Sequence, residues 1–284
     1  MTDHPIFERF SVVPSETTGI HVFDFIGGAT RVAYNRSWAT HAIAAGKTVS
    51  PNFPPKNEHY LDWIAVLTAA SKARGVFRMA EFGAGWGPWL VRGALAAKQR
   101  QDIQSHELLA VEADPTHYKW LVEHFEDNGL EPDQHHLIAG AVSLRSKSLR
   151  FPDIADPDLN YGASVKSAAN TKDTIEISGH TIEDLLSRFS GPLDLLHIDI
   201  QGEEYDVLPP AVDLLKSSVK AIMVGTHSND ELHENLAGLF QEGGWDERLN
   251  LGRNRVNETP WGEIQTNDGF LWFENSRMKQ SAAF

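Results

Sequence analysis

The first regular hydrophobic pattern along the chain lies in residues 60–73. Its apolar side chains recur at the spacing of one helix face: Tyr60, Trp63, Ile64 and Leu67. The residues before it show no such period, and residues 49–60 contain three prolines, which is typical of a loop. We therefore expect an irregular N-terminal extension, residues 1–56, that serves a substrate or partner, followed by one domain over residues 57–284.

Beyond residue 74, short apolar runs alternate with amphipathic segments. We expect strands over residues 77–82, 108–111, 136–142, 193–200, 219–224 and 269–273. We expect helices over residues 88–101, 116–128, 182–189, 203–208 and 231–242, with a further helical turn at 211–215. This alternation predicts an α/β fold in which a parallel sheet carries helices on both faces. Ligands of such sheets bind beyond the carboxyl ends of the strands.

Composition and charge narrow the classes of protein. The 284 residues include no cysteine, which excludes disulfides, thiolate nucleophiles and cysteine zinc sites. No apolar run reaches the length of a membrane span, and the first ten residues lack a signal-peptide pattern, so we expect a cytoplasmic protein. The net charge of -14 argues against nucleic-acid binding, because phosphate backbones are bound by basic surfaces.

The stretch EFGAGWGPW, residues 81–89, carries glycines at alternate positions between an expected strand and an expected helix. Glycine lets a backbone turn sharply and approach a ligand closely, and the helix start presents unpaired N–H groups. A nucleotide-type cofactor fits this context, while a plain strand–helix turn is the alternative. The spacing G-x-G-x-G differs from the G-x-G-x-x-G of dinucleotide-binding proteins. Glu112, at the end of the next strand in AVEADP, can accept both hydroxyls of a ribose.

Together with LDLLHIDIQGEEYDVL, these two motifs resemble the FkbM-like group of S-adenosylmethionine-dependent methyltransferases, over residues 78–275. The third motif is the most specific, because the group typically shows Asp-x-Glu-Gly-x-Glu followed by Val-Leu. The corresponding run here begins at Asp199 and has Gln201 in the place of the first glutamate, with Glu204 in the place of the second.

The resemblance implies a Rossmann-like, seven-stranded methyltransferase sheet with an antiparallel last strand, which residues 269–273 would supply. It implies S-adenosylmethionine as cofactor, with its methionine part near the glycine loop, its ribose on Glu112, and its adenine beside the residues around 113 and 140. The implied cofactor-binding residues are Glu81, Phe82, Gly83, Ala84, Gly85, Trp86, Gly87, Glu112, Ala113, Gly140, Ala141 and Asp199.

Methyl transfer depends on the alignment of the acceptor and on removal of its proton. Alignment can contribute roughly 7–11 kcal/mol, and a general base typically adds about 10²–10⁴-fold. Asp199 and His227 follow neighbouring strands, and His227 is the natural base because its ordinary pKa is near 6.5. A simple loop histidine is the alternative, and we expect His197 to be a hydrogen-bonded core residue. Asp199, Glu203 and His227 could instead hold a divalent metal such as magnesium.

These patterns together lead us to expect a methyltransferase that acts on a hydroxyl of a small-molecule or sugar-like acceptor. The hydroxyl preference comes from the family resemblance. A nicotinamide- or flavin-dependent oxidoreductase and a non-catalytic cofactor-binding protein are the competing interpretations. The sequence leaves the acceptor and the oligomeric state open.

Overall fold

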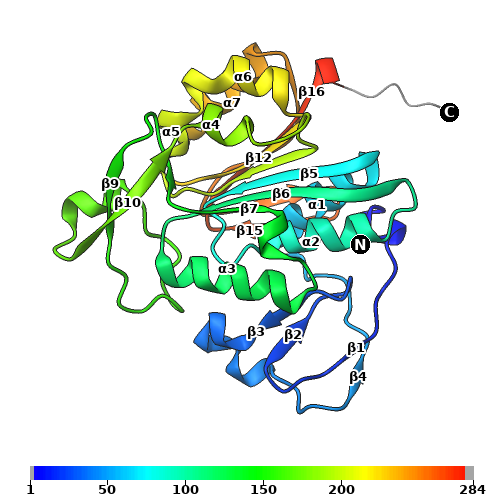
Figure 1. Cartoon of the computed structure of the whole chain (residues 1–284). Coiled ribbons are helices and arrows are strands. Elements are labelled where there is room, and N and C mark those ends of the chain that lie inside the picture. Colours follow the sequence, from blue (N-terminus) through cyan, green and yellow to red (C-terminus); the bar gives the residue numbers. More distant parts are fainter. Residues whose placement is uncertain (1–2, 279–284) are drawn as a thin grey trace.

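A seven-stranded sheet forms the centre of the computed structural model, which describes residues 3–278 (Figure 1). The strand order is β13-β16-β12-β11-β5-β6-β7. The strands are β5 (Gly75–Phe82), β6 (Ile103–Glu112), β7 (His136–Ala139), β11 (Leu195–Ile198), β12 (Ala221–Thr226), β13 (Trp245–Leu251) and β16 (Gly269–Asn275). Neighbours from β7 to β12 are parallel, whereas β16 runs antiparallel to both β12 and β13. The predicted α/β sheet with its antiparallel last strand is confirmed.

Helices cover both faces of this sheet, and so its central strands are apolar on both sides. The helices are α1 (His59–Lys72), α2 (Pro88–Lys98), α3 (Pro115–Asp127), α4 (Ile182–Leu186), α5 (Glu204–Val207), α6 (Val212–Ser218) and α7 (Asp230–Glu242). Alternate strand residues point to opposite faces: Met79 packs in the core under α1 and α2, while Ala80 packs in the core under α4 to α7. None of the helices in the described residues combines the length and apolar character that a bilayer crossing requires.

The strand expected over residues 136–142 is wrong, because it is broken at Gly140. β7 ends at Ala139, and β8 (Ala141–Val142) pairs instead with β10 (Thr174–His180), which also pairs with β9 (Ser148–Pro152). A Cβ atom at Gly140 would lie 2.4 Å from the carbonyl oxygen of Ser178, so the glycine permits this close approach. The small sheet of β8, β9 and β10 occupies a stretch that has no clear hydrophobic period.

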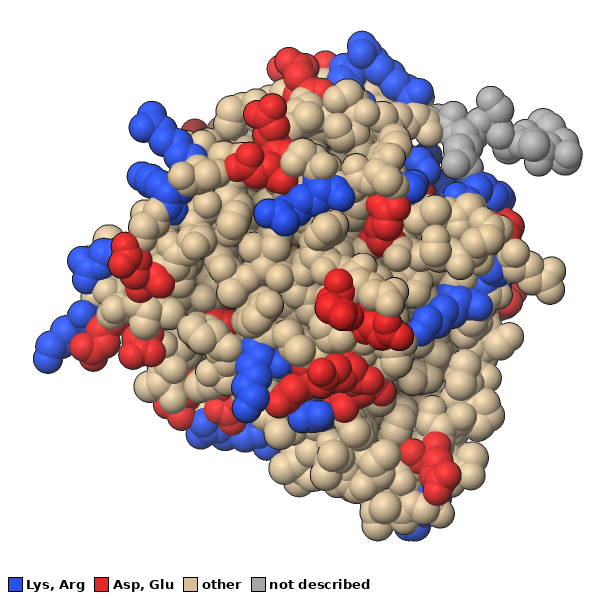
Figure 2. Space-filling view, viewed as in Figure 1, with Lys and Arg blue, Asp and Glu red and all other residues tan. Residues whose placement is uncertain are grey.

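Three further strands at the C-terminal end also lack a sequence signal. β13 lies at the edge of the main sheet, and β14 (Arg255–Thr259) pairs with β15 (Gly262–Thr266) as a separate hairpin. These strands are rich in polar residues and largely solvent-facing, so no run of apolar residues marks them. On the face of the molecule shown in Figure 2, acidic and basic side chains are interspersed, so the excess of acidic residues is spread out there.

The N-terminal extension forms short strands and turns that lie against α1, α2 and α3 (Figure 1). The strands are β1 (Ser15–Glu16), β2 (His21–Phe23), β3 (Ala29–Arg31) and β4 (Thr48–Val49), and 3-10 turns occur at Phe7–Arg9, Val32–Tyr34 and Arg36–His41. Aromatic contacts join the extension to α1: the ring centroids of Phe7 and Tyr60 lie 5.0 Å apart, and those of Phe25 and Trp63 lie 5.1 Å apart. The extension therefore contributes to the same hydrophobic core as α1 and α2.

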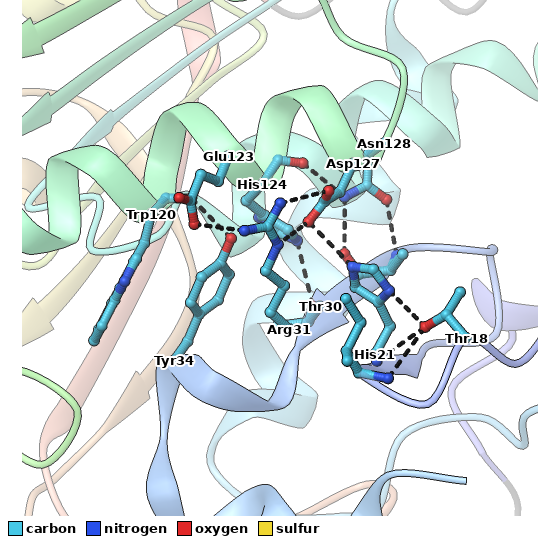
Figure 3. Close-up of polar contacts among 12 residues, drawn as sticks. Thr18, His21, Thr30, Arg31, Tyr34, Trp120, Glu123, His124, Asp127 and Asn128 are labelled. Carbon is cyan, nitrogen blue, oxygen red and sulfur yellow. Dashed lines mark hydrogen bonds and ion pairs between the residues drawn. The ribbon is translucent and has the colours of Figure 1, made fainter. Parts of the chain in front are cut away.

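Polar contacts hold the extension on α3 (Figure 3). The guanidinium group of Arg31 binds Asp127 through Nε at 2.7 Å and Glu123 through Nη1 at 2.8 Å. Just beyond the end of α3, Asn128 pairs with Ala29 like a strand: its Oδ1 accepts from the Ala29 N–H at 2.8 Å, and its Nδ2 donates to the Ala29 carbonyl at 2.9 Å. The backbone N–H and carbonyl of Ala29 are thereby hydrogen-bonded, although β3 lies outside the main sheet.

His124 links the extension to the glycine loop from within α3. Its Nδ1 donates to the carbonyl of Trp86 at 2.9 Å, so its Nε2 accepts from the hydroxyl of Thr30 at 3.3 Å. The ring is buried, and burial lowers the pKa of His124 to about 3. The imidazole is therefore neutral in the folded protein under all but strongly acidic conditions.

We expect this buried imidazole to make the protein sensitive to acid. Between the ordinary pKa of 6.5 and the folded value of about 3, the unfolded state binds a proton that the folded state does not. The free energy of unfolding should then fall by up to about 1.4 kcal/mol per pH unit from this group as the pH drops. Denaturant titrations across this range should give a shallower pH dependence for His124→Gln than for the wild type. Parallel slopes would contradict the assignment.

Candidate functional site

A cavity of about 620 Å³, here called the main cavity, lies at the carboxyl ends of β5, β6, β7 and β11. Most of the predicted cofactor-binding residues line it: Glu81, Gly83, Ala84, Gly85, Trp86, Glu112, Ala113, Gly140, Ala141 and Asp199. Phe82 and Gly87 do not. Phe82 is fully buried in the core under α4 to α7, and Gly87 is the N-cap of α2, where a Cβ atom would lie 2.4 Å from a methyl group of Leu121.

Two glycines of the loop are required for different reasons. Gly83 has a φ of +76°, and a Cβ atom there would lie 1.8 Å from the carbonyl oxygen of Asp199. Gly85 has a φ of +55°, and a Cβ atom there would only touch the ring of Tyr161 at 3.7 Å. Gly83 thus permits the packing of the loop on the end of β11, whereas Gly85 gives the loop its curvature beside the main cavity.

Glu112 holds the glycine loop closed from the end of β6. Its Oε2 accepts from the Gly85 N–H at 2.7 Å, and its Oε1 accepts from the Asp114 N–H at 2.8 Å. The side chain is buried, yet it borders the main cavity. Because each carboxylate oxygen has two lone pairs, Glu112 can accept further hydrogen bonds from a ligand.

Glu81 and His197 form a buried pair on neighbouring strands. The Nδ1 of His197 lies 3.2 Å from Oε1 of Glu81, and the N–H of Leu90 donates to the other carboxylate oxygen at 3.2 Å. Burial raises the pKa of Glu81. Burial would lower the pKa of His197, but the Glu81 carboxylate outweighs it and raises this pKa. His197 is hydrogen-bonded in the core as expected, and it also borders the main cavity.

His227 lies between two carboxylates. Its Nδ1 is 3.1 Å from Oε1 of Glu204, and its Nε2 is 3.1 Å from Oδ1 of Asp199. Burial alone would lower the pKa of His227, but the two carboxylates outweigh burial and raise it to about 10. The imidazole is thus protonated at neutral pH in this arrangement, which differs from the expected base with a pKa near 6.5.

Glu204, rather than Glu203, reaches His227. Glu204 is fully buried and accepts from the N–H groups of Gly202 at 2.8 Å and His227 at 3.0 Å, besides facing the imidazole. Glu203 lines the main cavity and accepts from the Lys166 N–H at 2.9 Å. No group of three or more His, Asp or Glu side chains among residues 3–278 could hold a metal ion. The suggested metal site therefore has no support in the described structure.

Gln201 occupies the place of the usual glutamate and contacts both catalytic candidates. Its φ of +53° is uncommon for a side-chain-bearing residue. Its Nε2 donates to Oδ1 of Asp199 at 2.8 Å and lies 3.0 Å from Nε2 of His227. A glutamate here would place one more carboxylate close to the imidazole, whereas the neutral amide can donate to a deprotonated Nε2.

Asp268 is a further carboxylate that sequence reasoning missed. It belongs to the turn before β16, and its Oδ2 lies 3.8 Å from Nε2 of His227. The next residue back, Asn267, is held by Glu58, which accepts from its N–H at 2.9 Å and from its Nδ2 at 3.1 Å. Asp268 borders the main cavity and also a smaller side cavity of about 100 Å³, which Asp199 and His227 also line.

Trp86 was predicted to line the cofactor site, but the aromatic wall around it was missed, because Trp38 and Tyr161 come from segments without a hydrophobic period. The ring of Tyr161 stacks on that of His117 with centroids 4.3 Å apart, and it meets the ring of Trp86 edge-on at 5.0 Å. Trp38 of the extension meets Trp86 at 5.4 Å. Each of these rings borders the main cavity. Only the folded chain brings them together.

Comparison with known proteins identifies the family of the chain. The family model described as "Methyltransferase FkbM domain" matches residues 93–245. A protein from Jannaschia sp. (strain CCS1), provisionally named a methyltransferase, is 31% identical over 239 residues, which cover 80% of this chain and 83% of that protein.

Solved structures resemble the chain more distantly. The SAM-dependent methyltransferase from Agrobacterium tumefaciens is 12% identical, with a TM-score of 0.48 over 94% of this chain and 71% of that one. Precorrin-6y C5,15-methyltransferase from Geobacter metallireducens GS-15 is 10% identical, with a TM-score of 0.42 over 74% of this chain and 86% of that one.

The two loop glycines should respond differently to the same substitution. Gly83→Ala places a methyl group against a backbone carbonyl that cannot move aside, so its cost should exceed the roughly 1–3 kcal/mol of ordinary overpacking. Gly85→Ala has room and should cost only about 1–2 kcal/mol for its left-handed backbone. Thermal and denaturant unfolding of the two variants measures the difference. Equal stabilities would show that the loop does not pack on Asp199 as described.

Proposed function

This chain belongs to the FkbM methyltransferase family, and we propose that it transfers a methyl group from S-adenosylmethionine to a hydroxyl of a small-molecule or sugar-like acceptor. The observation that carries the proposal is the main cavity itself. It is bordered by the glycine loop and Glu112 on one side and by Asp199, the partner of His227, on the other. A cofactor site and a proton-handling site therefore adjoin.

The charges around the main cavity fit a sulfonium cofactor better than a dinucleotide. Its lining has no Lys or Arg among the residues that the structure describes. The acidic residues that line it are Glu81, Glu112, Asp199, Glu203 and Asp268. The N–H of Gly85, which could bind a phosphate, is already bound by Glu112. A pyrophosphate would meet carboxylates here, whereas the positive sulfonium and ammonium groups of S-adenosylmethionine suit them.

S-adenosylmethionine, when bound, supplies an electrophilic methyl group on a sulfonium. The residues of the chain have to bind it, exclude water and orient the acceptor. Glu112 offers free lone pairs for the ribose, and the curved loop at Gly85 leaves space for the ligand. Alignment of this kind is worth roughly 7–11 kcal/mol, more than a single base contributes.

His227 is placed to take the proton of a hydroxyl acceptor at Nε2. Glu204 accepts a hydrogen bond from the Nδ1–H group and so holds the ring in one orientation. When Nε2 is deprotonated, Gln201 can donate a hydrogen bond to it. When Nε2 is protonated, Nε2 itself can donate to Asp199. Both states of the ring therefore have a partner. A positive charge in the main cavity would lower the pKa of His227 from about 10, because like charges disfavour the protonated form.

The side cavity suits a neutral acceptor with hydroxyl groups. Its polar lining includes Asp268, Thr266 and His59, with the ring of Trp89 as an apolar surface. No Lys or Arg of the described residues lines it. Carboxylates and a hydroxyl can hydrogen-bond sugar-like hydroxyls, while a phosphorylated acceptor would be repelled.

Cofactor binding should depend on Glu112. We expect S-adenosylhomocysteine to bind in the micromolar range and NAD not to bind at similar concentration. Glu112→Gln should weaken binding at least about tenfold, since a hydrogen bond to a charged group contributes roughly 1.5–3 kcal/mol. Titration calorimetry measures both effects. Glu107→Gln, farther back on β6 and bound to Arg78, is the matched control. Binding of NAD in preference to S-adenosylhomocysteine would refute the proposal.

The pH dependence of methyl transfer should identify the base. If the deprotonated form of His227 takes the proton, kcat/KM for a sugar or polyol acceptor should rise with pH above 7. The reason is that the pKa of His227 in the folded protein is well above 6.5. His227→Gln should lower turnover about 10²–10⁴-fold with cofactor affinity nearly unchanged. The measurement is single-turnover transfer of a labelled methyl group across this pH range.

Three outcomes would point elsewhere. A rate that is flat above pH 5 together with full activity in His227→Gln would remove His227 from the mechanism. Loss of activity on treatment with a chelator, restored by magnesium, would instead support a metal. Tight cofactor binding without transfer to any acceptor would favour the non-catalytic alternative.

A further inference from the structure

The N-terminal extension reaches into the main cavity. Asn35 and Trp38 line it, although they lie far outside residues 93–245, which the family model matches. On the basis of the proposed function, we propose that Asn35 and Trp38 belong to the cofactor site, and that Arg36 between them holds this part of the wall closed and limits cofactor release.

The contacts of Trp38 place it in a continuous aromatic wall. Its ring meets that of Trp86 nearly perpendicularly, at 85° and 5.4 Å. Trp86 in turn meets Tyr161, whose ring would touch a side chain at Gly85. The Nε1 atom of Trp86 is buried and has no hydrogen-bond partner among the described residues. This wall therefore stands directly beside the glycine loop.

Arg36 joins the two segments that carry this wall. Its Nε and Nη2 bind both carboxylate oxygens of Asp158, at 2.5 and 2.6 Å, and Nη2 also binds Asp156 at 2.8 Å. Nearby, the hydroxyl of Tyr161 donates to the carbonyl of Tyr34. A bidentate guanidinium–carboxylate pair fixes orientation as well as distance. The extension and the segment around Tyr161 are thus clamped together at the cavity.

Each of these segments is anchored on a different side of the molecule. The extension is held on α3 by Arg31 and Asn128 (Figure 3). The segment that follows Tyr161 is held beside α5, where the backbone N–H of Lys166 donates to Glu203 and its Nζ donates to the carbonyl of Gly202 at 2.7 Å. The Arg36 pair completes a line of contacts from α3 to α5, past the main cavity. A ligand bound in the main cavity should be released more easily once the ion pair between Arg36 and Asp158 has broken.

This arrangement separates an effect on release from an effect on folding. The Arg36 side chain is 54% exposed, and exposed ion pairs contribute little to stability. Loss of the pair should therefore leave the fold unchanged and alter the exchange of the ligand. A similarly exposed pair away from both cavities, between β14 and α7, serves for comparison: Arg255 binds Asp230 at 2.7 Å and is 50% exposed.

The test follows S-adenosylhomocysteine, which needs no known acceptor. Its dissociation rate is measured by stopped-flow tryptophan fluorescence and its affinity by calorimetry. Arg36→Ala should raise the dissociation rate roughly 3–10-fold while changing the melting temperature by less than about 4 °C. Trp38→Ala should weaken affinity roughly 2–10-fold, in line with the loss of one aromatic contact. Trp261 lies outside the linings of both cavities and meets the ring of His4 at 4.7 Å, so it also loses one aromatic contact when replaced. The controls Arg255→Ala and Trp261→Ala should bind and release the ligand like the wild type.

A double variant tests the pair itself. Adding Asp158→Ala to Arg36→Ala should raise the dissociation rate little further, because both changes break one interaction. High salt should speed dissociation from the wild type more than from Arg36→Ala, since exposed pairs are screened. If Trp38→Ala does not fold, Trp38→Phe replaces it.

The outcomes distinguish this proposal from the proposed function. Dissociation and affinity equal to the controls in both the Arg36 and Trp38 variants would overturn the role of the extension but leave the cofactor assignment intact. If the wild type binds neither S-adenosylmethionine nor S-adenosylhomocysteine, both proposals are overturned.

Discussion

The backbone after β5 passes so close to the end of β11 that only a hydrogen atom fits between Gly83 and the carbonyl oxygen of Asp199. This contact sets the position of the whole glycine loop. It brings the loop, the helix N-terminus that follows it and the carboxylate of Asp199 to one edge of the sheet. Glu112 then closes the loop from the neighbouring strand by binding the N–H of Gly85. The cavity and its chemistry follow from these two contacts.

The cavity that results is unusual in its charges. Carboxylates border it from several strands and turns, whereas the described part of its lining has neither Lys nor Arg. Two buried histidines face these carboxylates: His227 lies between Asp199 and Glu204, and His197 pairs with Glu81. An electrostatic environment of this kind stabilises a bound cation and raises the pKa of a neighbouring histidine by the same mechanism. In the function we propose, cofactor binding and proton transfer would therefore be electrostatically linked.

The extension contributes to the lining of the main cavity. Arg31, Asn128 and His124 tie it to α3 through groups that are partly or fully buried, and His124 also binds the carbonyl of Trp86 in the glycine loop. The same stretch of chain that is fastened on α3 continues into the wall of the cavity at Trp38. Segments of this kind are common carriers of specificity, because loops tolerate change while the sheet keeps the geometry.

Local sequence determines much of this protein. The apolar runs specify the central strands, because strands buried on both faces must be hydrophobic. The glycine loop and Glu112 mark the edge of the sheet at which the main cavity lies. The motif from Asp199 to Glu204 identifies the family, which the comparisons confirm. Tertiary structure decides the rest. The pKa of His227 depends on two carboxylates that flank it only in the fold, and the strand break at Gly140 depends on the approach of β10. The pairing of Arg36 with Asp158 joins residues 122 positions apart, and no local pattern encodes a contact between segments that lack a hydrophobic period.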